Sequence, residues 1–142
     1  MITLAYSYTI RMRKYELPPD VMIMLKGFCM GYNRKKARIQ NTYNLSSPPF
    51  DAPVQGGLPS DPTMRKAFDI LRDKADVQLI DDCLYEVSEG QKNIIIPLKK
   101  AVTENKGYRS VGIVYESADK FYLRRRQFYY TLYQKMKERG RI

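Results

Sequence analysis

The sequence predicts an all-α protein, a bundle of about four main helices with a short strand or arm at its N-terminus. Apolar residues recur at helical spacing in several segments, and clusters of Pro, Gly, Asn and Ser separate these segments. With 142 residues, of which 44% are hydrophobic, the chain is long enough to bury a modest core.

The N-terminal region divides into an arm and a helix. Residues 1–13 alternate apolar and polar side chains, a period of two that favours a strand or an extended arm, and we assign residues 1–14 to it. The N-terminal helix is expected within residues 15–43. Pro18 and Pro19 suit its first turn, where the missing N–H donor costs nothing. The apolar residues that recur at helical spacing are Val21, Leu25, Phe28 and Tyr32.

A connector, residues 44–61, is too rich in Pro, Gly and Ser for regular structure. The helical domain, residues 62–142, follows it. Asp61 is expected to cap its first helix, which begins at Pro62 and extends to about Val87. The apolar residues of this helix cover a surface wide enough to contact two neighbouring helices.

Two further helices are expected after that one. Residues 91–105 read as a shorter helix that starts or is interrupted near Pro97, and Asn105-Lys106-Gly107 ends it. The final helix is expected from Ser117 to about Glu138.

The charge of the chain indicates a polyanionic partner. Its 25 Lys and Arg residues against 15 Asp and Glu residues give a net charge of +10. Each cation that meets a phosphate releases a condensed counterion, so nucleic acid is a natural partner, although anionic membrane surfaces share this attraction. No apolar run is long enough to span a bilayer and no secretory signal is recognisable, so we expect no membrane partner and a cytoplasmic location.

Catalytic motifs are lacking, and we expect no enzyme, no cofactor and no metal site. The chain has no His, which removes the commonest general base and excludes Ser-His-Asp and Cys-His arrangements. The pair Gly56-Gly57 lacks the context of a phosphate loop, and Asp81-Asp82 reads as a solvated helix face. Cys29 and Cys83 lie in apolar surroundings and are expected to be buried free thiols.

The last helix carries the strongest functional signal. At about 100° per residue, Phe121, Phe128, Leu132 and Met136 form one apolar stripe that we expect in the core. Lys120, Arg124, Gln127 and Thr131 follow one flank of the stripe, and Tyr122, Arg126, Tyr133 and Lys137 follow the other, with Arg125 near the buried edge. From Ala118 to the end of the chain, the sequence has eight cations and two acids, Asp119 and Glu138.

A Gly-containing turn before a Ser-initiated basic helix is typical of a helix-turn-helix-like DNA-binding unit, here Gly112 followed by Ser117. The irregular stretch Lys106-Gly107-Tyr108 stands where the first helix of such a unit should lie. A solvated basic helix without a ligand remains the alternative. The predicted DNA-binding residues are Tyr115, Ser117, Lys120, Arg124, Arg125, Arg126 and Gln127.

A second basic run follows the middle of the N-terminal helix. Cations near a helix C-terminus are favourable without any ligand, so this run needs no partner to explain it. Its residues are nevertheless candidates for secondary phosphate contacts: Arg34, Lys35, Lys36 and Arg38.

Two stretches together resemble a known family, the RinA and ArpU-type phage transcriptional regulators. The N-terminal half of RinA-type activators is similar to Tyr15-Glu16-Leu17-Pro18-Pro19-Asp20, Gly27, Met30-Gly31-Tyr32, Arg34-Lys35, Gly57-Leu58-Pro59-Ser60-Asp61-Pro62-Thr63 and Lys66-Ala67. Their DNA-reading end is similar to Gly112-Ile113, Ser117, Phe121-Tyr122, Arg124-Arg125-Arg126, Phe128-Tyr129-Tyr130 and Leu132.

The resemblance implies a sequence-specific double-stranded DNA-binding regulator of phage or prophage late genes. Its DNA-binding unit would resemble the promoter-reading region of sigma factors and place Ser117, Lys120, Arg124, Arg126 and Gln127 near DNA. Host RNA polymerase and a second copy of the chain are further partners under this hypothesis, in the cytoplasm of a bacterial host cell. The alternative is a structural DNA-packaging protein, such as a small terminase subunit that recognises packaging DNA.

Overall fold

The computed structural model describes residues 13–44 and 62–142, which form α-helices and one 3-10 turn without any strand. This confirms the predicted all-α class. Asp61 and nearly all of both the N-terminal arm and the connector lie outside the described residues, and Arg13 and Lys14 of the arm are helical rather than extended. The helices are α2 (Pro19–Met30), α3 (Tyr32–Asn44), α4 (Pro62–Val87), α5 (Lys92–Glu104) and α6 (Ala118–Glu138), with the 3-10 turn η1 (Tyr108–Ser110) between the last two.

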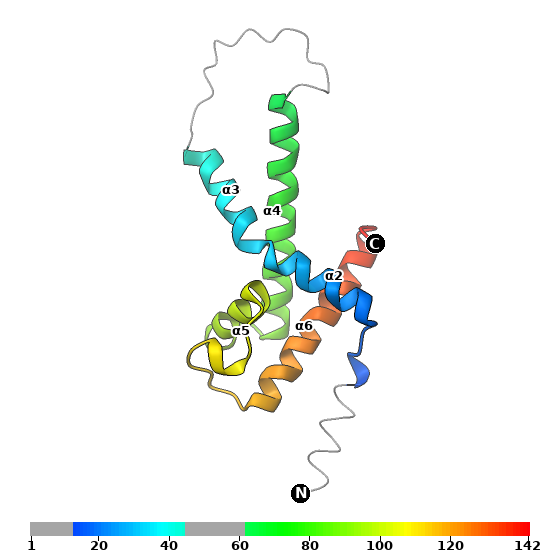
Figure 1. Cartoon of the computed structure of the whole chain (residues 1–142), viewed down its shortest axis with the longest axis vertical. Helices are drawn as coiled ribbons and strands as arrows, with labels where there is room; N and C mark the ends of the chain where they lie inside the picture. Colours follow the sequence, from blue (N-terminus) through cyan, green and yellow to red (C-terminus); the bar gives the residue numbers. More distant parts are fainter. Residues whose placement is uncertain (1–12, 45–61) are drawn as a thin grey trace, which may run out of the picture.

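The core lies where α2, α5 and α6 meet the C-terminal half of α4 (Figure 1). The apolar stripe predicted for the last helix is confirmed, because Phe121, Phe128, Leu132 and Met136 are all buried. On α2, Leu25 is buried as expected. The core residues that are fully inaccessible to solvent are Leu25, Cys29, Leu79, Ile80, Cys83, Leu98, Ala101, Val102, Phe128 and Leu132.

The expected single helix within residues 15–43 is wrong, because the chain bends at Gly31 and forms α2 and α3 instead. The Gly31 N–H donates to the Phe28 carbonyl at 3.3 Å, three residues back, so the regular helical pattern is interrupted there. Glycine favours helix poorly and is a common place for such a break. Beyond the bend, α3 runs along α4 and leaves α2 to cross α6 (Figure 1).

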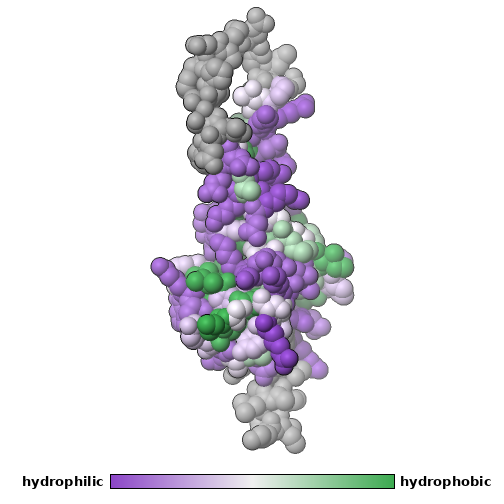
Figure 2. All heavy atoms as spheres, turned by 60° about the vertical axis from the view of Figure 1, so that its left-hand side comes forward, coloured by the Kyte–Doolittle hydropathy of each residue, from purple (hydrophilic) through white to green (hydrophobic). Residues whose placement is uncertain are grey.

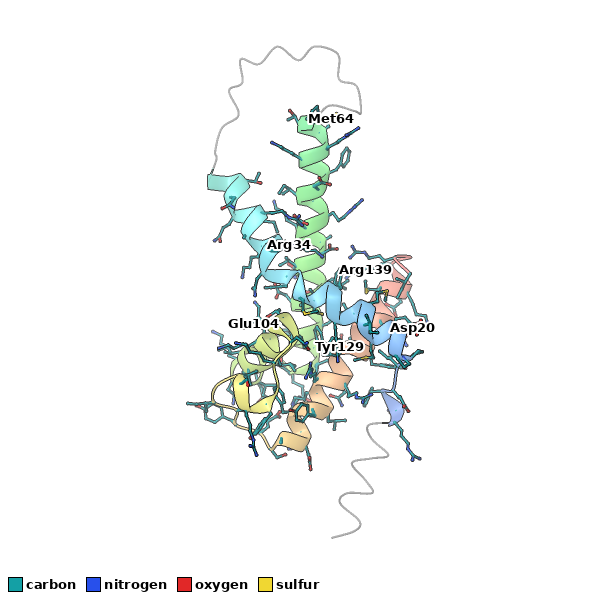
Figure 3. All side chains as sticks on the ribbon, viewed as in Figure 1. Asp20, Arg34, Met64, Glu104, Tyr129 and Arg139 are labelled. Carbon is teal, nitrogen blue, oxygen red and sulfur yellow. The ribbon has the colours of Figure 1, made fainter. Side chains whose placement is uncertain are left out.

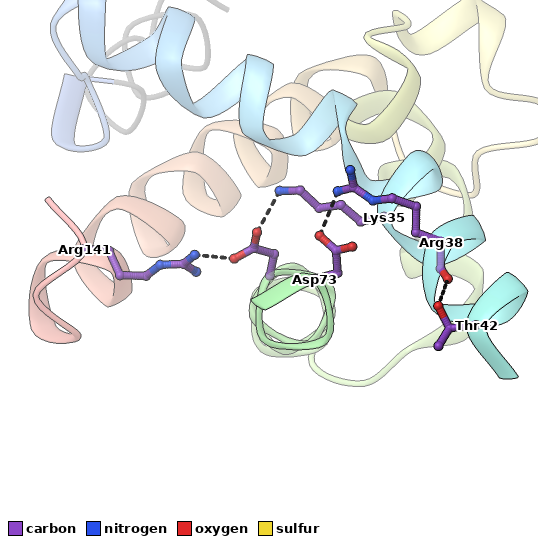
Figure 4. Close-up of polar contacts among 6 residues, drawn as sticks. Lys35, Arg38, Thr42, Asp73 and Arg141 are labelled. Carbon is purple, nitrogen blue, oxygen red and sulfur yellow. Dashed lines mark hydrogen bonds and ion pairs between the residues drawn. The ribbon is translucent and has the colours of Figure 1, made fainter. Parts of the chain in front are cut away.

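Two ion pairs attach α3 to α4. Lys35 Nζ lies 2.9 Å from Asp76 Oδ2, and Arg38 Nη2 lies 2.8 Å from Asp73 Oδ1 (Figure 4). The cations are three residues apart on one helix and the acids three residues apart on the other, so each pair meets on facing surfaces. The face of the molecule over α3 and α4 is correspondingly hydrophilic (Figure 2).

Asp76 also joins the C-terminus to this region. The Arg141 guanidinium donates to Asp76 Oδ1, while Lys35 pairs with the other carboxylate oxygen (Figure 4). The Phe28 ring lies against both cations, 4.2 Å from Lys35 Nζ and 5.6 Å from the Arg141 guanidinium carbon. A carboxylate only 4% exposed therefore links α2, α3, α4 and the chain end.

Replacing Asp76 with Ala is expected to lower the free energy of unfolding by about 3 kcal/mol, because two cations lose a buried partner. Chemical denaturation followed by circular dichroism measures the change. Asp82→Ala is the matched control, since this partly exposed acid on α4 pairs with no cation among the described residues and accepts a hydrogen bond from Gln78, and about 0.5 kcal/mol is expected there. Equal losses in the two variants would show that Asp76 has no special role.

Candidate nucleic-acid interface

Helix α6 begins as the sequence predicts. Ser117 is its N-cap, and the Ser117 hydroxyl oxygen accepts a hydrogen bond from the Lys120 backbone N–H at 3.3 Å. Asp119 in the first turn complements the positive end of the helix dipole. The start of the predicted DNA-contacting helix is therefore fixed by its own sequence.

The connection between α5 and α6 does not form an identifiable helix-turn-helix. Such a unit joins two helices through a turn of about 3–4 residues. Here residues 105–117 connect the helices and contain only η1, a 3-10 turn. The irregular stretch noted in the sequence is the reason, because Asn105 adopts a left-handed conformation with φ 54° and ends α5.

Tyr108 attaches this connection to α6. Its backbone N–H donates to the Tyr122 hydroxyl at 3.1 Å, and its own hydroxyl donates to the Glu116 carbonyl at 3.1 Å. At Gly107, a Cβ atom would lie only 3.2 Å from the Tyr122 hydroxyl, so the close approach suits glycine. Tyr115, the first residue of the predicted DNA-binding set, is 71% exposed.

Arg124 is engaged within the fold. Its Nε lies 2.6 Å from Glu116 Oε1, and its Nη1 donates to the Val87 backbone carbonyl at 2.7 Å. The side chains of Arg124 and Glu116 are only 20% and 12% exposed. This geometry joins the start of α6 to the end of α4 and leaves little of the guanidinium for a base.

The flank of α6 that carries Lys120, Arg124 and Gln127 lines a groove of about 390 Å³. The structure thus brings these three predicted residues together, with Thr131 beside them. However, Glu86 at the end of α4 and Glu89 in the turn that follows also line this groove. Two carboxylates in the same groove oppose the approach of a phosphate.

The other flank of α6 lines a more cationic groove of about 500 Å³ against α2, which we name the α2–α6 groove. It contains three cations and one acid, whereas the first groove contains two cations and two acids. Figure 3 shows Tyr129 on α6 where α2 crosses it. The residues that line the α2–α6 groove are Glu16, Leu17, Pro19, Met22, Lys26, Tyr122, Arg125, Arg126 and Tyr129.

The cations of this groove differ in their contacts. Arg125 Nη2 donates to Asn105 Oδ1 at 3.2 Å, and the Arg125 guanidinium carbon lies 5.9 Å from the Tyr129 ring centre. Arg126 and Lys26 form no ion pair with the described acids. Sequence reasoning missed Lys26, although it is the sole cation of α2, a helix of largely apolar side chains.

The second basic run is divided between two uses. Lys35 and Arg38 hold α3 against α4, so their charges are largely neutralised by Asp76 and Asp73. Arg34 and Lys36 are exposed, and Lys36 Nζ lies 5.6 Å from the Tyr32 ring centre. Figure 3 shows Arg34 on α3. The Lys35 side chain is 12% exposed, whereas that of Arg38 is 52% exposed, so Arg34, Lys36 and Arg38 remain the candidates for secondary phosphate contacts.

The buried thiols are poor nucleophiles. Burial raises the pKa of the Cys29 thiol, and it raises the pKa of Cys83 to about 12. Both side chains are free thiols in the core, as predicted. Within residues 13–44 and 62–142, no group of three or more acids and thiols is placed to hold a metal ion.

No protein-family model, curated protein or solved structure matches this chain. The resemblance to RinA and ArpU-type regulators therefore stays a prediction. None of the described helices is long and apolar enough to cross a membrane.

Arg124→Met is expected to lower the free energy of unfolding by about 2 kcal/mol, because Glu116 and the Val87 carbonyl lose a charged donor. Thermal and chemical denaturation measure this loss. Arg126→Met is the control, since this guanidinium has no ion-pair partner among the described residues, and a change within about 0.5 kcal/mol is expected. An Arg124 variant of unchanged stability would return this residue to the DNA-contacting set.

Tyr129→Phe is expected to reduce the loss of stability at alkaline pH. Burial raises the pKa of Tyr129 to about 12, and its hydroxyl makes no hydrogen bond of normal geometry with the described residues, although Arg125 lies nearby. The unfolded chain releases this proton first, so the stability present below pH 10 or so is lost as the pH rises through about 12.

Denaturation curves between pH 7 and pH 12 or so test this expectation. At pH 7, Tyr129→Phe should be neutral or stabilising by about 1 kcal/mol, because a buried unpaired hydroxyl is removed. Tyr115→Phe, which removes a phenol outside the core at a position 71% exposed, is the control. Identical alkaline curves for the wild type and Tyr129→Phe would contradict the assignment.

Proposed function

We propose that this chain is a double-stranded DNA-binding regulator of phage or prophage genes and contacts the phosphate backbone through the α2–α6 groove. The observation that carries the proposal is the meeting of Lys26, Arg125 and Arg126 with Glu16 as the groove's single acid. Three cations within one groove attract phosphates more strongly than the same charges dispersed over the surface.

The tyrosines of the groove support the same partner. The Tyr122 hydroxyl accepts a hydrogen bond from the Tyr108 N–H, so its own proton remains available for a phosphate oxygen. Tyr122 also packs edge-on against Phe121, with ring centres 5.4 Å apart, which fixes the position of its ring. Tyrosine hydroxyls and arginine side chains are both common donors to backbone phosphates.

We assign base reading to the flank of α6 that carries Lys120 and Gln127, with fewer residues than the sequence suggests. Arg124 is withdrawn from this role because Glu116 and Val87 hold its guanidinium. Lys120 is exposed and Gln127 half-buried, and both side chains are long enough to reach base edges. Discrimination between sequences is therefore expected to depend on these two residues rather than on the arginine triplet.

The double variant Lys26→Gln and Arg126→Gln is expected to weaken duplex binding about uniformly across sequences. Two lost phosphate contacts should reduce the slope of log K against log salt by about 2. Fluorescence anisotropy with a labelled duplex at several salt concentrations measures both quantities. The charge-matched control is Lys92→Gln with Lys100→Gln, which neutralises two exposed cations of α5 outside the groove.

Equal losses of duplex affinity in the two double variants would contradict DNA contact through the α2–α6 groove, because net charge alone would then explain binding. Equal affinity of the wild-type chain for promoter fragments and random duplex would contradict a sequence-specific regulator. A stable ring by light scattering, with no effect on transcription, would instead favour the structural DNA-packaging alternative.

A further inference from the structure

The N-terminal half of α4 carries an exposed apolar stripe. Met64, Phe68 and Leu71 are 39%, 62% and 60% exposed, and the small Ala75 continues the row. The spacing of four, three and four residues is that of alternate d and a positions in a heptad. Single exposed apolar residues are ordinary, but four in register on one helix face indicate a contact surface.

Most of this stripe faces away from the body of the protein, and of its residues Leu71 also lines the groove of about 1280 Å³ between α3 and α4. At about 100° per residue, the stripe lies roughly 130° around α4 from the side that buries Asp73, Asp76, Ile80 and Cys83. Helix α3 occupies that buried side through its two ion pairs (Figure 4). The sequence predicts an apolar surface on this helix wide enough to contact two neighbouring helices. In the first half of α4, the side that carries the stripe has no neighbouring helix among the described residues.

The charges beside the stripe select the kind of partner. Arg65 and Arg72 lie at the e positions, directly next to the d residues Met64 and Leu71. Both arginines are exposed and form no ion pair with the described acids. The apolar row ends at Gln78, whose side chain donates to Asp82 at 2.7 Å. The surface is thus a short apolar seam with a cationic edge.

An antiparallel second copy of the chain fits this surface poorly. In an antiparallel pair, e positions face each other, so Arg65 of one copy would meet Arg72 of the other. Like charges across a helical seam are destabilising. A partner helix with Glu or Asp in these places would instead pair with both arginines.

We propose that the Met64–Ala75 face of α4, which we name the α4 seam, docks an acidic amphipathic helix of a partner protein. Its apolar a and d residues would cover Phe68 and Leu71, and its acids would face Arg65 and Arg72. Charge complementarity carries this choice of occupant. The inference is independent of DNA binding, because no residue of the α4 seam lines the α2–α6 groove.

The test uses two labelled synthetic peptides of about three heptads, both with Leu at a and d. One has Glu at e and g, and the other has Lys there. Fluorescence anisotropy with the full chain should show the acidic peptide binding at least about tenfold more tightly. Phe68→Ser with Leu71→Ser should weaken that binding about tenfold or more, whereas Ile96→Ser, at an equally exposed apolar position on α5, should not.

A charge swap gives the sharpest outcome. Arg65→Glu with Arg72→Glu should reverse the preference in favour of the basic peptide. Acidic-peptide binding that survives Phe68→Ser with Leu71→Ser would overturn the proposal, because net charge would then explain it. A dimer in sedimentation that these two changes dissolve would also overturn it, in favour of a second copy.

Folding and DNA binding are followed separately. Circular dichroism of the Phe68→Ser, Leu71→Ser variant should match the wild type, because both side chains are more than half exposed. Its affinity for duplex DNA should be unchanged. A variant that loses peptide binding but keeps DNA binding supports the α4 seam whether or not the α2–α6 groove is the DNA contact.

Discussion

Two buried carboxylates of α4, those of Asp73 and Asp76, hold α3 in place, and Asp76 also binds the C-terminal end of the chain. Among the described side chains of α3, that of Tyr32 alone is buried, so little apolar surface packs this helix against the rest of the protein. Lys35 and Arg141 neutralise Asp76 from opposite sides, and the Phe28 ring packs against both of their charged groups. A buried charge is unfavourable unless it is fully paired, so these partners must form together.

Much of the fold could be predicted because each helix carries its own signals. The starts of α2 and α4 at prolines, the Ser117 cap and the stripe through Phe121 and Phe128 are all local features of the sequence. The bend at Gly31 could not be predicted in the same way. A helix tolerates one glycine at a cost of about 1 kcal/mol, so the contacts of α3 with α4, distant in sequence, decide the outcome.

The candidate site was less predictable, for a related reason. Helical periodicity correctly separated the two flanks of α6, but it could not show what faces each flank. Arg124 meets a carbonyl 37 residues away, and the first groove gains acids from the end of α4 and the turn that follows. Lys26 reaches the second groove because α2 crosses α6, a contact that no local pattern encodes. The charges on a helix follow from its own sequence, whereas the electrostatic field around it also depends on residues that the tertiary fold brings close.

The length of α4 relates the two proposed surfaces to each other. This helix of 26 residues is about 39 Å long and has no glycine or internal proline after its first residue. Its first half carries the α4 seam, and its second half packs in the core that supports α6. A helix without a break holds a partner at a fixed distance from the α2–α6 groove. Under both proposals, the protein would therefore position an acidic partner relative to bound DNA.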